Sequence, residues 1–338
     1  MNVVVLGAGR WGPNHIRNFH SMKCVTSCVV VDTNPDCLKE IVKLFPDIVT
    51  YQSFDEALKK EELDAVVIAT PVFTHFDIAQ KALERGLHTL VEKPMCAKSD
   101  EIKTLNKLAK KVGKVLMVNH VFLYNNSIRA VKEVLQSGTL GDILYLKSNR
   151  TNLGPVRLDV NALWDLASHD ISIFNYWLDD KPLDAFVTGI QTLNKGIDDM
   201  NTGIFSYKGG VVAEVHASWL NPFKTREITV VGSEKMLSWN DLDEVQVRIF
   251  DKGVTAGDQR TDSFDAHKTV VHSGGIVIPT FDVNEPLLTA CEHFMDCIYD
   301  NKPCLTDGAN AYEVVRILEV ADQSREKGQV ISIDWTNL

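Results

Sequence analysis

The hydrophobic residues in the first third of the chain form short continuous runs, separated by stretches of helical periodicity. The strands predicted from this pattern include Val3–Leu6, Val25–Val31 and Ala65–Ala69, and each has the length of a buried strand. Strands that alternate with helices are typical of a parallel sheet with helices on both faces. The pattern therefore predicts a doubly wound α/β domain over residues 1–120, with six strands of which the last is Val115–Val118.

The pattern changes after residue 120, where stretches of alternating apolar and polar residues dominate, as in a sheet with one covered face. The predicted strands are Ile143–Ser148, Ala185–Thr192, Thr202–Ser206, Val211–Trp219, Arg226–Val231 and Val245–Phe250. The predicted helices are Ser127–Leu135, Trp164–Leu178, Glu285–Tyr299 and Ala309–Lys327. We therefore expect a second α+β domain over residues 121–338, with a large, mostly antiparallel open sheet. Its uncovered face could pack against another subunit.

Composition narrows the classes of partner. The formal charge of -10 argues against nucleic acid or an anionic membrane as the main partner. The seven cysteines form no Cys-x-x-Cys pair and are odd in number, which favours free thiols in a reducing cytoplasm over a metal site or a disulfide framework. No apolar run reaches membrane-spanning length, and Met1 leads straight into a strand without a signal peptide. We expect a cytoplasmic protein with a small-molecule partner and no metal.

A glycine fingerprint, Gly7-Ala8-Gly9-Arg10-Trp11-Gly12, lies between the first strand and a helix that begins near Pro13. In this context the glycines close the turn, admit a pyrophosphate and let the helix pack, while the helix N-terminus offers N–H groups to the phosphates. Asp32 ends the second strand and suits two ribose hydroxyls. The following Thr33-Asn34-Pro35 lacks the base that an NADP site usually has. The predicted cofactor is NAD; the alternative is a glycine turn without a nucleotide. The predicted contacts here are Gly7, Gly9, Arg10, Trp11, Gly12 and Asp32.

Polar residues follow the other predicted strands at their carboxyl ends, where ligands bind in an open α/β sheet. Thr89–Val91 runs into Glu92-Lys93-Pro94, and the proline fixes the backbone after the lysine. Lys93 is therefore well placed to act on a bound molecule, although a solvated strand end is the alternative. The predicted contributors to the cofactor site from these strand ends are Thr70, Pro71, His75, Glu92, Lys93 and Asn119.

The predicted helix Trp164–Leu178 carries a carboxylate and an imidazole one turn apart. Asp165 and His169 are separated by four residues and share a face. A lone histidine is more often structural, but a neighbouring carboxylate can orient its ring and raise its basicity. His169 is therefore a candidate acid–base residue with Asp165 as its support. We expect Asp170 to be a buried partner of the backbone or of an arginine.

Three of these motifs occur together in a family-specific order. The glycine fingerprint, Glu92-Lys93-Pro94 and Asp165-x-x-x-His169 have the order and spacing seen in the Gfo/Idh/MocA oxidoreductases, which the chain resembles over nearly its whole length. The resemblance implies a nicotinamide cofactor, catalytic roles for Lys93 and His169, support from Asp165, Glu92 near the nicotinamide ribose, and dimers or tetramers built through the sheets. One departure is Phe122-Leu123-Tyr124-Asn125-Asn126, where many members have an Arg-x-x-Pro-like stretch.

The segment from Asn149 to Asn161 resembles members that oxidise C3 of a UDP-linked N-acetyl sugar before an aminotransferase acts. Arg150 and Arg157 could meet a diphosphate through bidentate hydrogen bonds, as could Lys224 and Arg226; ordinary ion pairs are the alternative. The sequence thus predicts NAD-dependent oxidation of a sugar secondary alcohol, with C3 of UDP-N-acetylglucosamine favoured. The predicted substrate-binding residues are Lys93, Arg150, Arg157 and His169.

Other functions stay open at this point. Within the same class, the substrate could be UDP-N-acetylglucosaminuronate, a free sugar or an inositol. In another class, the protein could bind dinucleotide as a transcriptional co-regulator without turnover. The joint presence of Lys93, Asp165 and His169 argues against that reading. We expect His169 to be the general base and Lys93 to stabilise the alkoxide, although the two roles could be exchanged.

Overall fold

The computed structural model describes residues 1–255 and 270–336, which divide into two compact units. The first unit contains Met1–Tyr124 and Glu285–Arg316, and the second contains the described residues of 125–284 and 317–336. The first boundary lies four residues beyond the expected division at 120. Residues 285–316 were expected in the second domain but belong to the first unit. This placement follows from the helix α8 (Pro286–Tyr299), whose Ala290, Cys291 and Phe294 are buried in the core of the first unit.

The first unit is the predicted doubly wound domain. Its six strands are parallel, in the order β3-β2-β1-β4-β5-β6 that is characteristic of dinucleotide-binding folds. The strands are β1 (Asn2–Leu6), β2 (Ser27–Val31), β3 (Val49–Tyr51), β4 (Ala65–Ile68), β5 (His88–Val91) and β6 (Leu116–Val118). The helices are α1 (Gly12–Ser21), α2 (Pro35–Leu44), α3 (Phe54–Lys60), α4 (His75–Glu84), α5 (Ser99–Val112), α8 and the start of α9 (Gly308–Lys327).

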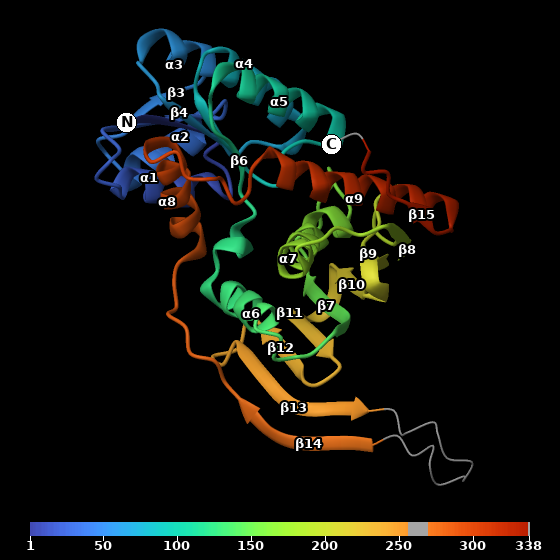
Figure 1. Ribbon diagram of the computed structural model, residues 1–338. Helices are drawn as coiled ribbons and strands as arrows, with labels where there is room; N and C mark the ends of the chain where they lie inside the picture. The colour runs from blue at the N-terminus through green and yellow to red at the C-terminus, as the bar shows by residue number, and fades with distance from the viewer. Residues whose placement is uncertain (256–269, 337–338) are drawn as a thin grey trace, which may run out of the picture. The chain divides into compact units, whose positions relative to one another are not determined.

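Helices cover both faces of this sheet because its strands are apolar on both sides. Val3 and Val5 of β1 share one core with Phe19 of α1 and Phe294 of α8, whose rings meet edge to face. Val4 of β1 is also fully buried and points to the opposite face. Figure 1 shows α4 and α5 on one side of the sheet, with α1 and α8 on the other. The sheet therefore presents only its strand ends for binding.

The second unit is built on a nine-stranded sheet in the order β14-β13-β12-β11-β7-β10-β9-β8-β15. All neighbouring pairs are antiparallel except β7 and β10, which confirms the expected architecture. The strands are β7 (Ile143–Leu153), β8 (Asp184–Ile190), β9 (Met200–Ser206), β10 (Val212–Ser218), β11 (Leu220–Gly232), β12 (Met236–Asn240), β13 (Val247–Thr255), β14 (Val270–Val277) and β15 (Ile331–Ser332). Its helical segments include α6 (Asn126–Gln136), the π-helical turn η3 (Leu163–Ala167), α7 (Ser168–Leu178) and the remainder of α9. Figure 1 shows β13 and β14 side by side at one edge of the sheet.

The two faces of this sheet differ in exposure. Val187 and Phe205 point toward the helices and are buried, as is Trp239, whose Nε1 donates to Ser127 Oγ of α6 at 2.8 Å. On the other face Phe186 and Ile204 lie opposite each other on β8 and β9 and are exposed. Because strand residues alternate between faces, the open face carries apolar side chains that the described residues leave uncovered.

The starts of three helices differ in how they are capped. Ser53 precedes α3, but its side chain makes no capping hydrogen bond, and Ser99 is the first residue of α5 instead of its cap. Asn34, by contrast, caps α2 by accepting the Asp36 N–H at 3.0 Å. Within residues 1–255 and 270–336, no helix combines the length and apolar character needed to cross a bilayer.

Candidate active site

The glycine fingerprint has the local geometry that a dinucleotide requires. Gly7 adopts a φ of 95°, and a Cβ there would lie 2.6 Å from the carbonyl oxygen of Ala69. A Cβ at Gly12 would lie 2.0 Å from the carbonyl oxygen of Gly7, so only glycine lets α1 begin this close to the strand. A Cβ at Gly9 would meet nothing within 4 Å, which leaves its backbone open to a phosphate. Arg10 and Trp11 are exposed beside it. The loop therefore fits the pyrophosphate of NAD.

Asp32 lies at the end of β2, where its carboxylate holds the surrounding loops. Its Oδ2 accepts the N–H of Ala8 at 2.6 Å, and its Oδ1 accepts the N–H of Asn34 at 2.8 Å. Each oxygen has a second lone pair, so the carboxylate could still accept bonds from ribose hydroxyls. The same carboxylate would repel the additional phosphate of NADP.

We expect NAD to bind at least ten times more tightly than NADP, a difference of about 1.4 kcal/mol. Thr33→Arg combined with Asp32→Ala should narrow the gap, because it adds a cation for the phosphate and removes the opposing charge. Calorimetry with both dinucleotides provides the measurement, and Thr33→Arg alone is the matched control. Equal affinities in the wild-type protein would contradict the prediction.

Glu92 is buried at the end of β5 and is held by three donors. His15 Nε2 of α1 lies 2.7 Å from Oε1, Asn119 Nδ2 donates to the same oxygen at 2.8 Å, and the N–H of Lys93 donates to Oε2 at 3.1 Å. Burial raises the pKa of the carboxyl, but hydrogen bonds from His15 and Asn119 outweigh burial and hold the pKa below its ordinary value. The carboxylate is therefore ionised, and it links the glycine-loop helix to the ends of β5 and β6.

Lys93 follows Glu92 and is partly buried. His75 lies below this turn: its Nδ1 is 3.0 Å from the carbonyl oxygen of Pro94, and its Nε2 is 2.8 Å from that of Thr70. Burial lowers the pKa of His75. Both ring nitrogens face main-chain oxygens and the protonated one donates to its carbonyl, so His75 is placed to position the turns after β4 and β5. The sequence prediction of direct contact with the cofactor stays a prediction for His75, Thr70 and Pro71.

In the second unit, Asp165 lies in the π-helical turn η3 and His169 lies in the first turn of α7. The Asp165 carboxylate accepts from Arg157 Nη1 at 3.1 Å and from Trp219 Nε1 at 3.2 Å. These donors fix the carboxylate, and π-helical turns are frequent at functional sites. His169 is half-buried. Its role as a base, with support from Asp165, remains a prediction.

The two arginines predicted to bind a diphosphate both have carboxylate partners. Arg150 Nε and Nη2 donate to Asp170, with the shortest distance 2.7 Å, and both side chains are buried. This confirms the expectation that Asp170 is a buried partner. Arg157 pairs with Asp159 and Asp165. Both arginines thus form ion pairs, and their contact with a diphosphate stays a prediction. Arg226 likewise pairs with Asp241.

Two side chains that organise the site were not singled out from the sequence. His15 reaches Glu92 across 77 residues of sequence, and Trp219 reaches Asp165 across 54. The one signal available for His15 was a histidine on the buried face of α1, between Gly12 and Ile16. For Trp219, no feature of the neighbouring sequence indicated a contact with Asp165.

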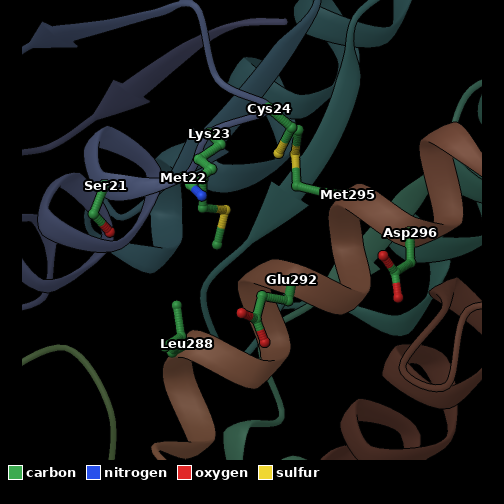
Figure 2. A pocket seen from close by; sticks show the side chains of 8 residues that line it. All are labelled: Ser21, Met22, Lys23, Cys24, Leu288, Glu292, Met295 and Asp296. Carbon is green, nitrogen blue, oxygen red and sulfur yellow. The ribbon is translucent and has the colours of Figure 1, made fainter.

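A shallow groove of about 450 Å³ lies at the opposite end of α1 from the glycine loop (Figure 2). It lies between Met22 and Cys24, which follow α1, and the α8 residues Leu288, Glu292 and Asp296. Ten helical residues span about 15 Å, so the groove is separate from the phosphate-binding turn. Its lining carries two carboxylates against the single ammonium of Lys23, which disfavours an anionic nucleotide.

The seven cysteines are all free thiols, and two of them form a compact cluster with a histidine. His293 and Cys297 of α8 and Cys304 place their donor atoms within 4.8 Å of one another. However, His293 Nε2 accepts the Leu305 N–H at 3.1 Å, so its lone pair already has a main-chain donor. The cluster is explained as a network that ties the end of α8 to the following loop.

Comparison with known sequences agrees with this geometry. Residues 1–120 match the profile of the Gfo/Idh/MocA oxidoreductase family, NAD-binding Rossmann fold, and residues 128–238 match the Gfo/Idh/MocA C-terminal domain. The chain belongs to the Gfo/Idh/MocA family. Its first unit is therefore an NAD-binding Rossmann domain, as the glycine loop and Asp32 indicate.

Relatives within the family act on several substrates. The chain is 25% identical over 323 residues to a UDP-N-acetylglucosamine 3-dehydrogenase of Acidithiobacillus ferrooxidans, covering 93% of this chain and 94% of the relative. It is 23% identical to a scyllo-inositol 2-dehydrogenase (NAD(+)) of Bacillus subtilis, covering 98% and 95%. Among solved structures, GenD2 from gentamicin A biosynthesis with NAD has a TM-score of 0.84 at 21% identity, covering 99% and 96%. That likeness shows the shared fold.

Proposed function

We propose that the protein is an NAD-dependent dehydrogenase that oxidises a secondary alcohol of a sugar, with C3 of UDP-N-acetylglucosamine as the favoured position. The observation that carries the proposal is Lys93 at the carboxyl end of β5, next to the buried Glu92 network, in a chain of an oxidoreductase family. The choice of sugar is supported by the similarity to the A. ferrooxidans enzyme over nearly the whole chain.

The proposed roles follow from the chemistry of each side chain. Bound NAD would supply the acceptor for the hydride that leaves the carbinol carbon. His169 takes the hydroxyl proton as general base, and the Lys93 ammonium stabilises the developing alkoxide. Asp165 positions His169 through the fixed carboxylate described above. The glycine loop and Asp32 hold the dinucleotide.

A screen of substrates for NADH formation tests this proposal. UDP-N-acetylglucosamine should be oxidised faster than N-acetylglucosamine, scyllo-inositol or UDP-N-acetylglucosaminuronate, with an aminotransferase added to remove the ketone. UDP alone should compete with the substrate. Competition by UDP tests recognition of the nucleotide directly, whereas a substitution of Arg157 would also remove an ion-pair partner of Asp165.

Turnover of a free polyol without inhibition by UDP would favour the inositol or free-sugar alternative, which the B. subtilis relative supports. NAD binding without turnover of any sugar would favour the non-catalytic co-regulator. We further propose a cytoplasmic location, consistent with seven free thiols, and functional coupling to a sugar aminotransferase.

We also propose that the protein is a homodimer or homotetramer assembled through the open sheet face with Phe186 and Ile204. Their exposed apolar side chains support this surface. Light scattering should give a mass two or four times that of the chain, and Ile204→Glu should lower it. A wild-type monomer would contradict the proposal.

A further inference from the structure

His120 stands at the end of β6, next to the strand end that carries Lys93. Val118 of β6 pairs with Val91 of β5 in parallel register, and the next residue, Asn119, donates to Glu92. The residues that follow on the two strand ends are His120 and Lys93. The positive charge of Lys93 acts on the His120 ring, in agreement with this placement.

The His120 side chain is buried with its hydrogen-bonding capacity unused. It is 1% exposed, and among the described residues neither Nδ1 nor Nε2 has a hydrogen-bond partner. Burial, and then the charge of Lys93, lower the pKa of His120 to about 3, so the ring is neutral and offers one donor and one acceptor. Most buried polar groups are paired, and a pair of unsatisfied atoms calls for an explanation.

An apolar ring would fill the same space without the desolvation penalty that two unpaired nitrogens carry. A ligand that can both donate and accept a hydrogen bond would remove the penalty, and a sugar hydroxyl has this property. On the proposed function, Lys93 meets the hydroxyl that is oxidised, so the neighbouring His120 would meet a hydroxyl close to it. A pocket that pairs a substrate hydroxyl discriminates strongly against analogues without one.

We propose that His120 is a substrate-binding residue whose neutral imidazole pairs with the sugar hydroxyl adjacent to the one that is oxidised. This inference rests on the proposed sugar oxidation. It assigns His120 to substrate recognition, separate from proton transfer by His169 and from the cofactor contacts of the glycine loop.

His120→Phe tests the proposal, because phenylalanine keeps a ring and removes both nitrogens. On a sugar that the wild type oxidises, kcat/KM should fall ten- to hundred-fold, while NAD affinity changes less than two-fold. The ligand-free variant should unfold at the same temperature as the wild type or higher, since no bond in the ligand-free protein is lost. His120→Gln, which retains a donor and an acceptor, should recover part of the activity.

His88→Phe is the matched control, at the opposite end of β5. His88 Nδ1 accepts the Val115 N–H at 3.2 Å, so this variant should lose thermal stability and keep its kcat/KM. A substrate analogue that lacks the neighbouring hydroxyl should react poorly with the wild type and lose little more with His120→Phe.

Unchanged kcat/KM in His120→Phe would overturn the inference, as would a loss confined to NAD affinity or one that accompanies a large fall in unfolding temperature. In each of these cases the wild type still oxidises sugar, so the proposed function stands. If the wild type oxidises no sugar, the proposed function fails and this inference fails with it.

Discussion

His169→Ala is expected to lower kcat/KM by about 10²–10⁴-fold, the usual contribution of a positioned acid–base group. Protonation of the imidazole removes the base, so wild-type kcat/KM should fall as the pH is lowered. This acid limb should flatten in the variant. The measurement is the pH–rate profile of both proteins on the same sugar. An acid limb that survives unchanged would assign the base to another group, and Lys93 would be the next candidate.

Lys93→Met tests stabilisation of the alkoxide by Lys93 separately from proton abstraction by His169. The variant should bind NAD normally but lose kcat more than it gains in KM, because the lost interaction is made mainly in the transition state. Lys98→Met is a matched control, since Lys98 is exposed just beyond the same turn. A rise in KM alone would show that Lys93 binds the substrate without stabilising the alkoxide.

Asp170→Ala is expected to destabilise the second unit by about 3–5 kcal/mol, because it removes the buried carboxylate that pairs with the Arg150 guanidinium. The two side chains are only 4% and 1% exposed, and their hydrogen bonds are bidentate. The double variant Arg150→Met, Asp170→Leu should recover most of the loss, since it removes both charges. Thermal and urea unfolding followed by circular dichroism provide the measurement.

Glu214→Ala serves as the control in the same sheet. Glu214 pairs with Lys147 between β10 and β7, and both side chains are substantially exposed. Such pairs contribute about 0–1 kcal/mol. If Asp170→Ala destabilises the protein no more than Glu214→Ala does, the guanidinium of Arg150 reaches solvent and the pair is not buried in solution.

The sequence predicted strands wherever burial leaves a continuous or alternating signal. Val3–Leu6 is apolar throughout because helices cover both faces of β1. β14 (Val270–Val277) was missed because its His272-Ser273-Gly274-Gly275 interior interrupts any alternation, and β12 is only five residues long. Both strands are defined by their pairing with neighbouring strands, and the hydrophobic pattern within a short stretch of sequence does not reveal that pairing.

The same distinction applies to the site. The glycine loop and Asp32 could be predicted because their geometry is local to one βαβ unit. The partners of Glu92 could not, since His15 and Asn119 reach it across 77 and 27 residues. For Arg150 the sequence left two roles open, and only its burial against Asp170 favours one of them.

The packing of α8 in the first unit limits how members of the family could exchange their cofactor-binding domains. Recombining residues 1–120 with those of an NADP-dependent relative would place a foreign α1 against the recipient's α8, where Phe19 and Phe294 now meet with centroids 6.4 Å apart. A viable chimera needs both 1–124 and 285–316, with its last junction inside α9. Cofactor preference should therefore evolve more readily by point changes near Asp32 than by transfer of whole domains.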